Sequence, residues 1–477
     1  MRIVLKGIFS CDKRCATLTL ASRFSGVFTM VKAHVVGAGL AGSEAAWQLV
    51  SRGIPVVLHE MRPGKMTAAH QTGDFAELVC SNSLKSMADH SAPGLLKREM
   101  LALGSLVIKA GLDAKVPAGQ ALAVNREMFS KIIEQSLVNT GLVTIDRSEI
   151  TTIPSEDELT KSGDIWILAT GPLTSDALAA QIQELAGGEK RLHFYDAIAP
   201  VIDADSIDGE KGFMADRWEK GEDGGDYLNL PMNKDEYNAF IDAVIAAEKM
   251  PLHEFEDVKY FESCLPIEVM IERGRDTLRF GPMKPVGLTD PRTGRWPYAN
   301  VQLRKENLDA TMFSMVGFQT KMKWPEQKRV FALIPGLENA EYLRFGSVHR
   351  NTYIKSPVAL EADLSFRKNR RVFLAGQISG VEGYTESAAM GLIAGRNGAA
   401  IIKGEQASLP PNDTMIGSLL NYVTVGPLGD YAPMNANLGL LPAIAKVRGK
   451  GKKDRQEEKA RNAWLSFDNW QSAQQSM

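Results

Sequence analysis

The sequence has little cysteine, no long apolar run and almost no net charge. Four cysteines among 477 residues are too few for a disulfide framework, which fits a reducing compartment such as the cytoplasm. No apolar run is long enough to cross a bilayer, which predicts a soluble protein of two or three domains without a membrane partner. The 55 basic residues nearly cancel the 57 acidic ones, so any RNA site must be a local patch.

Two sequence motifs are also absent. The chain contains no CxxC and no second GxGxxG, which argues against a dedicated NAD(P)H-binding domain of the disulfide-reductase kind. Cys11 and Cys15 offer only two metal ligands, fewer than the four of a structural zinc site, so no metal is predicted.

The first 29 residues differ from the rest. They carry five basic residues and one acid, Asp12, before Met30 begins the first predicted strand. Such a segment is typical either of a transit peptide or of an extension from an upstream start. We expect it to be removable without loss of the cofactor, because no apolar periodicity ties it to a core.

A glycine-rich turn, GxGxxG, follows the predicted strand over residues 31–36 and leads into a predicted helix over 43–51. In this context Gly37 permits the tight turn, Gly39 lets backbone N–H groups approach a pyrophosphate, and Gly42 lets helix and strand pack closely. A second predicted strand over 54–58 places Glu60 where its carboxylate can accept from a ribose hydroxyl. The alternative is a glycine-rich turn that only packs a helix. The motif residues are Gly37, Ala38, Gly39, Leu40, Ala41 and Gly42.

A second glycine-rich segment favours FAD over NAD. The apolar run 372–376 predicts a buried strand, and Gly376, Gln377 and Tyr384 lie in the loop that leads to a predicted helix over 387–402. The positive N-terminal end of such a helix can face the negatively charged edge of a reduced flavin. Taken alone, the segment also fits an ordinary strand, loop and helix of an α/β sheet.

These elements predict an α/β fold, with a Rossmann-like FAD-binding domain and an inserted α+β domain. Strands are predicted at 120–124, 143–146 and 164–169. From about residue 175 to about residue 340 short strands, helices and turn residues alternate, which indicates an insertion. The predicted limits are 1–29 for an N-terminal extension, 30–174 and 341–450 for the two parts of the FAD-binding domain, 175–340 for the inserted domain, and 451–477 for a tail.

Six stretches together resemble one enzyme family: Gly37–Gly42, Glu60–Pro63, Leu78–Ser86, Phe261–Glu268, Gly383–Gly391 and Pro433–Asn437. The family is the folate- and FAD-dependent tRNA (uracil-5-)-methyltransferases, and the resemblance covers residues 31–450. It implies a bacterial enzyme that takes carbon from 5,10-methylenetetrahydrofolate, uses NAD(P)H as reductant and makes 5-methyluridine at position 54 of tRNA. It also implies that Cys80 and Cys264 are catalytic. Residues 1–29 and the tail after Arg455 have no counterpart.

The chemistry explains why two cysteines would be needed. Uracil C5 is a poor nucleophile, so a thiolate adds at C6 to create an enolate, and a base later removes the C5 proton. A reduced flavin can carry the one-carbon unit and supply the hydride. Cys80 lies in a polar loop with Lys85 nearby, and such surroundings favour a thiolate. From the sequence alone each cysteine also fits a buried inert thiol, and which one would be the nucleophile stays open.

Three further features are weaker candidates. Tyr384 resembles a residue that stacks on flavin or folate, and Trp324 could help to hold a planar ligand, although packing explains both equally well. A basic run near the C-terminus fits either phosphate contacts with tRNA or a solvated tail. Its residues are Lys446, Arg448, Lys450, Lys452, Lys453 and Arg455.

Two other functions fit parts of the sequence. One is the larger flavoprotein that modifies wobble uridines, which resembles this chain around the FAD motifs but continues into a long helical C-terminal domain. The other is a flavin-binding RNA chaperone, which would need no reactive cysteine.

Overall fold

The computed structural model describes residues 31–188, 192–217, 225–250, 265–428, 431–444 and 451–475. Cys11, Cys15 and Cys264 lie outside the described residues. So do three residues of the basic run, Lys446, Arg448 and Lys450.

One sheet is mostly parallel and has six strands: β1 (Ala33–Val36), β2 (Val56–His59), β6 (Val143–Asp146), β7 (Ile165–Leu168), β16 (Ser365–Phe366) and β17 (Asn369–Leu374). Their order across the sheet is β16-β17-β7-β1-β2-β6, and only β16 runs antiparallel to its neighbour. All four residues of β7 are buried, as is typical of a parallel strand covered on both faces. Strand β17 therefore joins late residues of the chain to the first ones.

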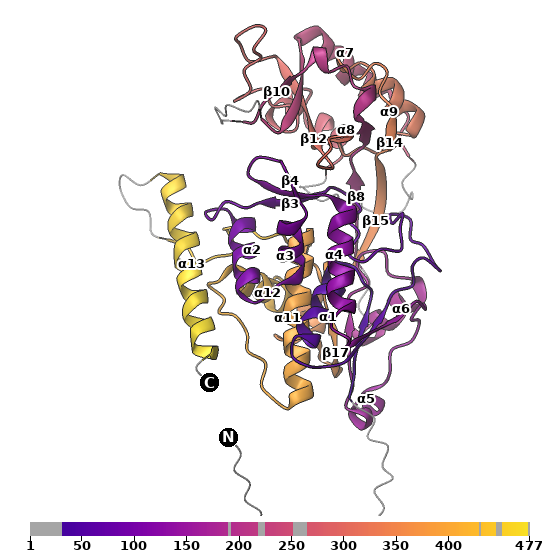
Figure 1. Ribbon diagram of the computed structural model, residues 1–477, viewed down its shortest axis with the longest axis vertical. Coiled ribbons are helices and arrows are strands. Elements are labelled where there is room, and N and C mark those ends of the chain that lie inside the picture. Colours follow the sequence, from indigo (N-terminus) through magenta and orange to yellow (C-terminus); the bar gives the residue numbers. More distant parts are fainter. Residues whose placement is uncertain are drawn as a thin grey trace, which may run out of the picture. The chain divides into compact units, whose positions relative to one another are not determined.

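Helices α1 (Leu40–Val50) and α11 (Tyr384–Lys403) lie side by side against this sheet (Figure 1). Their contact needs a glycine, because a Cβ at Gly391 would stand 2.1 Å from the carbonyl oxygen of Ala41. The other helices of this part are α2 (Ala92–Ala102), α3 (Leu106–Asp113), α4 (Arg126–Val138), α5 (Glu156–Ser162), α6 (Asp176–Leu185), α10 (Ser356–Ala359) and α12 (Met415–Val425).

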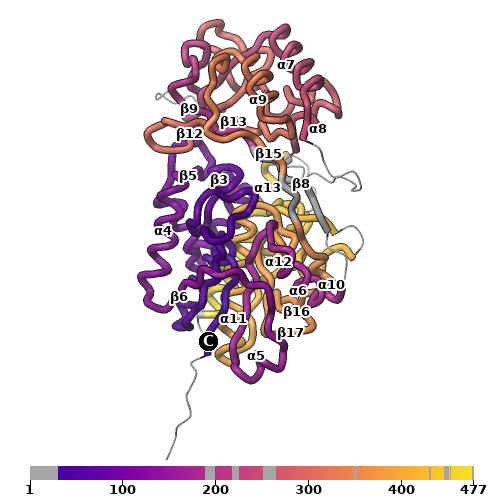
Figure 2. Tube along the Cα trace, turned by 90° about the vertical axis from the view of Figure 1, so that its right-hand side faces the viewer, coloured from indigo at the N-terminus to yellow at the C-terminus, as the bar shows by residue number. Residues whose placement is uncertain are grey.

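The second sheet is antiparallel and has its own core. Its strands are β9 (Val201–Asp203), β10 (Phe213–Met214), β11 (Tyr227–Met232), β12 (Ala299–Lys305), β13 (Met312–Met315) and β14 (Tyr342–Arg344), in the order β10-β11-β12-β13-β9-β14. Helices α7 (Lys234–Ala246), α8 (Ile267–Glu272) and α9 (Trp324–Phe331) accompany it (Figure 2). The rings of Phe240, Phe318 and Phe331 pack together in this core.

Two small sheets complete the described strands. β3 (Ser83–Ser86), β5 (Ala121–Val124) and β4 (Lys115–Val116) form an antiparallel sheet in that order. β8 (Leu192–Ile198) pairs antiparallel with β15 (Ser347–Tyr353). The predicted strand at 120–124 is thus β5, but it lies in the small sheet next to β3 rather than in the parallel one.

The last helix, α13 (Lys452–Gln475), occupies residues for which the sequence analysis predicts a tail. Ala460, Ala463 and Phe467 are buried, at the i, i+3, i+7 spacing of one helix face. The guanidinium of Arg98 on α2 lies 3.7 Å from the centre of the Trp464 ring. Residues 452–475 therefore form a helix with one buried face, while Lys453 of the basic run is exposed.

The predicted elements of the parallel sheet are confirmed, with two shifts at helix starts. α1 begins at Leu40 and α11 at Tyr384, each three residues before the predicted start. In both cases the residue before the helix is a glycine, and the helix begins directly from the loop. The domain limits stay a prediction. None of the helices within the described ranges combines the length and apolarity needed to span a bilayer.

Candidate active site

The GxGxxG turn has the geometry that a bound pyrophosphate requires. Gly37 adopts φ 97°, and its N–H donates to the carbonyl of His59 at 2.7 Å. A Cβ at Gly42 would stand 1.7 Å from the carbonyl oxygen of Gly37, whereas a Cβ at Gly39 would have no atom within 4 Å. No side chain caps the N-terminus of α1. Gly42 thus serves packing, while Gly39 borders open space in front of uncapped N–H groups.

Glu60 follows β2 and ties the turn to the next loop. Its carboxylate accepts from the N–H of Ala38 at 3.0 Å, and from the N–H, Nε and Nη2 of Arg62, each at 3.0 Å. Burial alone would raise the pKa of Glu60, but the hydrogen bonds and charge of Arg62 hold it below its ordinary value. Because four protein donors already surround this carboxylate, a ribose hydroxyl would have to share or replace one of them.

Arg62 is a residue that the sequence analysis missed, although it lies in the quoted stretch Glu60–Pro63. Its guanidinium also donates to Glu77 at 3.0 Å and to the carbonyls of Thr72 and Asp74. Arg62 is almost fully buried, so it fixes the loop over residues 72–77 that closes one side of the pocket.

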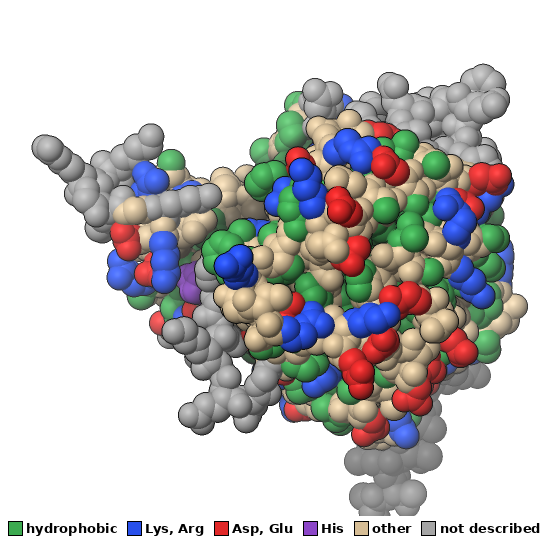
Figure 3. Space-filling model, turned by 90° about the horizontal axis from the view of Figure 1, so that it is seen from above, with side chains coloured by type: hydrophobic (Ala, Val, Ile, Leu, Met, Phe, Trp, Pro, Cys, Tyr) green, Lys and Arg blue, Asp and Glu red, His purple; other side chains and the backbone are tan. Residues whose placement is uncertain are grey.

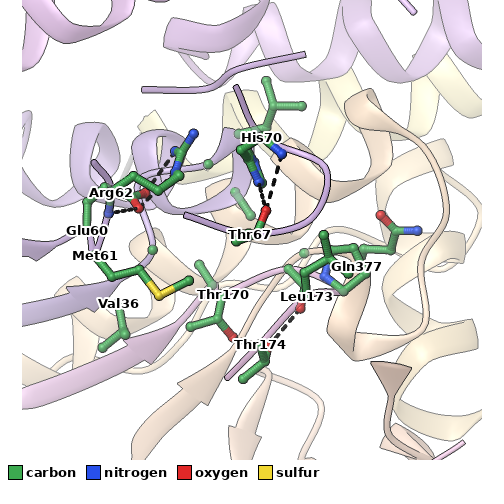
Figure 4. Close-up of a pocket in the computed structure, with 18 of the residues that line it drawn as sticks. Val36, Glu60, Met61, Arg62, Thr67, His70, Thr170, Leu173, Thr174 and Gln377 are labelled. Atoms are coloured by element: carbon green, nitrogen blue, oxygen red, sulfur yellow. Dashed lines mark hydrogen bonds and ion pairs between the residues drawn. The ribbon is translucent and has the colours of Figure 1, made fainter. Parts of the chain in front are cut away.

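The second glycine-rich segment forms the opposite wall. Gly376 has φ 82°, Gln377 begins a short 3-10 turn, and Tyr384 begins α11. Figure 4 shows Gln377 across the pocket from Glu60 and Arg62, with Thr170, Leu173 and Thr174 from the turn after β7 between them. The sequence analysis predicts that strand but gives the residues after it no role.

One pocket joins the two glycine-rich segments. It encloses about 1300 Å³ of atom-free space, its open mouth included, and Cys80 also lines it. The residues fit FAD. The open space at Gly39 and the uncapped start of α1 suit its pyrophosphate. The segment from Gly376 to Tyr384 provides a wall for its flavin ring. Of the predicted site residues the pocket brings together Gly37, Gly39, Leu40, Ala41, Glu60, Cys80, Gly376, Gln377 and Tyr384.

Cys80 is half-buried in the wall beside Tyr384. The Tyr384 phenol oxygen accepts from the backbone N–H of Cys80 at 2.6 Å and from that of Ser81 at 3.2 Å. Burial, followed by the proximity of Cys80, raises the pKa of Tyr384, so the phenol keeps its proton. Tyr384 thereby holds the peptide on the amide side of Cys80.

Two arginines hold the carbonyl side of the same loop. Arg344 donates to the carbonyls of Val79 at 2.9 Å and Cys80 at 2.8 Å. Arg126 donates to the carbonyls of Leu78 and Cys80, and its Nε pairs with Glu306 at 2.8 Å. Burial alone would lower the pKa of Arg126, but the Glu306 carboxylate outweighs it and raises that pKa.

Most of the chain is similar to known proteins of one family. The family model of glucose inhibited division protein A matches residues 32–406. The chain is 51% identical over 437 residues to the methylenetetrahydrofolate–tRNA-(uracil-5-)-methyltransferase TrmFO of Geobacter sulfurreducens, with 91% of this chain and 98% of that protein covered. For the TrmFO of Heliobacterium modesticaldum the identity is 53% over 434 residues, with 91% and 96% covered. The chain belongs to the TrmFO family.

Solved structures place the TrmFO family chain in a known fold. Aquifex aeolicus GidA in its form II crystal is similar with a TM-score of 0.66 at 17% identity, over 93% of this chain and 74% of that one. The form I crystal gives 0.65 at 16% identity, over 92% and 76%. At this identity the likeness concerns the fold alone, and it confirms the predicted fold class.

The weaker candidates of this TrmFO family member lie elsewhere. Trp324 is 58% exposed, stacks on Phe345 with centroids 5.5 Å apart and does not line the pocket. Lys85, expected near Cys80, pairs with the buried Glu386 at 2.9 Å. Within the described residues, no cluster of histidine, cysteine, aspartate and glutamate could hold a metal ion.

Proposed function

We propose that this chain methylates C5 of the T-loop uridine of tRNA, position 54, with carbon from 5,10-methylenetetrahydrofolate, FAD as cofactor and NAD(P)H as reductant. The observation that carries the proposal is the single pocket lined by the GxGxxG turn, by the Gly376–Tyr384 segment and by Cys80. Relatives that are 51% and 53% identical are named for the same carbon donor and the same base.

The residues around the pocket have separate tasks in this proposal. The N–H groups at the start of α1 bind the pyrophosphate, with Gly39 leaving it room, and Glu60 lies where the ribose would be. FAD, when bound, carries the one-carbon unit and supplies the hydride, since methylene carbon is two electrons short of a methyl group. The Gln377–Tyr384 wall closes the space on the flavin side.

Cys80 and Cys264 supply the two steps on the uracil ring. One thiolate adds its electron pair to C6 and leaves an enolate at C5, which attacks the one-carbon unit. The other group removes the C5 proton, and the electrons of that bond release the one-carbon carrier and leave an exocyclic methylene on C5. A hydride, which bound FAD would supply, adds to this methylene, and the resulting enolate re-forms the C5–C6 double bond and expels the thiolate. The assignment of the two roles stays open. Tyr384, Arg126 and Arg344 fix the backbone of Cys80 and so limit where its thiol can reach.

The reductant and the tRNA complete the proposal. Because the chain has one GxGxxG, we infer that NAD(P)H reduces the flavin in the same pocket rather than from a domain of its own. The face in Figure 3 shows basic and acidic side chains interspersed, without a large area of one sign. A local contact therefore fits better than a broad basic surface, and Lys453 and Arg455 at the start of α13 are candidates. A tRNA substrate implies a cytoplasmic enzyme.

A labelled-donor assay tests the proposal. Unmodified tRNA is incubated with the purified protein, NAD(P)H and methylenetetrahydrofolate labelled in its methylene carbon, and nucleosides are analysed by mass spectrometry. We expect labelled 5-methyluridine, and none with a tRNA that carries cytidine at position 54. Label from S-adenosylmethionine would contradict the proposal, because a sulfonium donor needs no redox cofactor.

The same analysis separates the other two functions. A wobble-uridine enzyme would leave position 54 unmodified and change the anticodon instead. An RNA chaperone would bind tRNA and modify no nucleoside. The 51% identity to TrmFO of Geobacter sulfurreducens, whose name specifies methylation of uracil at C5, favours the methyltransferase over the other two functions.

A further inference from the structure

The loop that carries Cys80 is bonded to the second sheet on both sides of the cysteine. Arg344, the last residue of β14, reaches the carbonyls of Val79 and Cys80 at 2.9 and 2.8 Å. Two residues further along, Asn82 donates to the carbonyl of Lys305 at 3.1 Å and accepts from Arg304 at 2.9 Å. Lys305 and Arg304 belong to β12. The second sheet, through β12 and β14, therefore helps to fix the position of Cys80.

Arg344 joins the Cys80 loop to β14 at an energetic cost, because its charged guanidinium is buried. Its Nε is buried and has no hydrogen-bond partner within the described residues. Burial, and then the positive charge of Arg126, lower the pKa of Arg344. A neutral amide could bond a backbone carbonyl without the cost of burying a charge beside another.

The Arg344 guanidinium bonds two backbone carbonyls at once, which a single donor cannot do. Its two Nη groups bond consecutive carbonyls, Val79 and Cys80, from one rigid plane. Two such bonds fix the rotation of the peptide units on either side of the Cys80 Cα, and with it the direction of the Cα–Cβ bond that carries the thiol. Tyr384 bonds the amide of the same residue, so the backbone of Cys80 is held at both its N–H and its C=O.

We propose that Arg344 is a positioning residue that orients the Cys80 thiol and makes this orientation depend on the second sheet. The inference rests on the proposed function. Ile267, three residues after Cys264, is fully buried in the core of the second sheet. The described chain that follows Cys264 thus belongs to the core of the second sheet, and Arg344 ties the Cys80 loop to the same sheet.

Replacing Arg344 by alanine tests this role in the full-length protein loaded with FAD. Turnover at saturating tRNA should fall about 100-fold, as a small misplacement of a reacting group does, while the KM for tRNA and the FAD content stay within about twofold. Guanidinium ion at millimolar concentration should restore part of the turnover, because it can refill the vacated site. Iodoacetamide should alkylate the Cys80 peptide at a rate that differs from the wild type, because the thiol is no longer held in one direction.

Arg279→Ala is the matched control. Arg279 also lies in the part of the chain that carries the second sheet, bonds the backbone carbonyl of Tyr298 at 2.9 Å and stacks 3.7 Å from the centre of its ring. Among the described residues, its partners are Asp276 and Tyr298, neither of which holds the Cys80 loop, so we expect wild-type turnover and no response to guanidinium. An equal loss in Arg279→Ala would overturn the inference in favour of general destabilisation.

Two other outcomes would overturn it. One is an Arg344→Ala protein with wild-type turnover and wild-type alkylation of Cys80. If that variant fails to fold, Arg344→Lys decides: one ammonium cannot span both carbonyls, so turnover should fall about tenfold, and a wild-type rate sinks the idea. Failure of the proposed function would instead show in the wild type, as absence of 5-methyluridine, and the alkylation comparison does not depend on methylation.

Discussion

The phenol oxygen of Tyr384 lies 2.6 Å from the backbone nitrogen of Cys80, a residue 304 positions earlier in the chain. This bond links the start of α11, which forms one wall of the pocket, to the loop of a cysteine implicated in the chemistry. Ring and hydroxyl of Tyr384 therefore act on different partners: the ring lines the pocket, and the hydroxyl holds the Cys80 backbone.

Tyr384→Phe should keep FAD and lose turnover. The ring that lines the pocket remains, whereas the N–H groups of Cys80 and Ser81 lose their acceptor, at a cost of about 1–3 kcal/mol for a buried donor. We expect turnover about tenfold or more below the wild type, with an unchanged flavin absorption spectrum. A variant that methylates at the wild-type rate would show that the bond is dispensable.

Gly39→Val should fold and yet purify without FAD. The backbone at Gly39 has φ −70°, which valine adopts without strain, and its Cβ would meet no protein atom within 4 Å. The added side chain would occupy the space expected for the pyrophosphate. Flavin absorbance per protein and circular dichroism measure the two effects; a yellow variant that retains FAD would contradict the proposed site.

Gly42→Ala is the informative comparison for that experiment. Its Cβ would stand 1.7 Å from the carbonyl oxygen of Gly37, so α1 must move away from the turn. We expect a clear drop in Tm together with flavin loss, in contrast to Gly39→Val, in which the flavin alone is lost.

Cys80→Ala and Cys264→Ala should each abolish methylation and leave FAD bound. Loss of a positioned nucleophile or a positioned base costs at least about 100-fold in rate, while the glycine turn that is expected to bind the pyrophosphate is unchanged. Binding of tRNA should survive in both variants, since binding and chemistry are separate events. RNA with 5-fluorouridine at the target should trap the nucleophile as a thioether, because fluorine cannot leave as a cation, and peptide mass spectrometry then locates it. Wild-type rates in both variants would refute the cysteine mechanism.

Lys97→Met should change how stability depends on pH. Lys97 is fully buried and donates to the carbonyl of Leu84 at 2.7 Å, and burial lowers its pKa from 10.5 to about 7. Between these two values the unfolded chain binds a proton that the folded chain does not, so the free energy of unfolding falls as the pH falls from 10.5 to about 7, by up to about 1.4 kcal/mol per pH unit. Below that window this contribution is constant.

The variant lacks this proton linkage, so its Tm relative to the wild type should rise as the pH is lowered through the window. Thermal unfolding at several pH values measures the difference, with Lys109→Met, at an exposed position of α3, as the control. A Tm difference between Lys97→Met and wild type that stays constant with pH would mean that Lys97 is charged in the folded protein throughout.

Sequence reasoning found those parts of the site that depend on local signals. The GxGxxG turn and the Gly376 loop are fixed by glycines and strands adjacent to them in sequence, and both line the pocket as predicted. Arg126 and Arg344 reach Cys80 from 46 and 264 residues away, and no local pattern marks an arginine whose partners are backbone carbonyls. Only the folded chain reveals them.

Lys85 has a partner that local sequence reasoning did not find. Its position five residues after Cys80 suggested that it supports the thiolate. Its φ of 64° is rare for a residue with a side chain, and its ammonium pairs with Glu386, a carboxylate without solvent exposure. A buried carboxylate without a counter-ion is strongly destabilising, and the Lys85 ammonium is the counter-ion of Glu386.

The place of β17 in the parallel sheet has a consequence for synthesis. β7 lies between β1 and β17, and translation delivers the whole second sheet before β17 leaves the ribosome. Throughout that interval the four apolar residues Ile165–Leu168 form an unpaired sheet edge on the nascent chain, the kind of edge that pairs with other chains. Nor can FAD be enclosed until Gly376 and Tyr384 have emerged. The length of the chain between β7 and β17 thus sets how long this apolar edge stays unpaired and without FAD during synthesis.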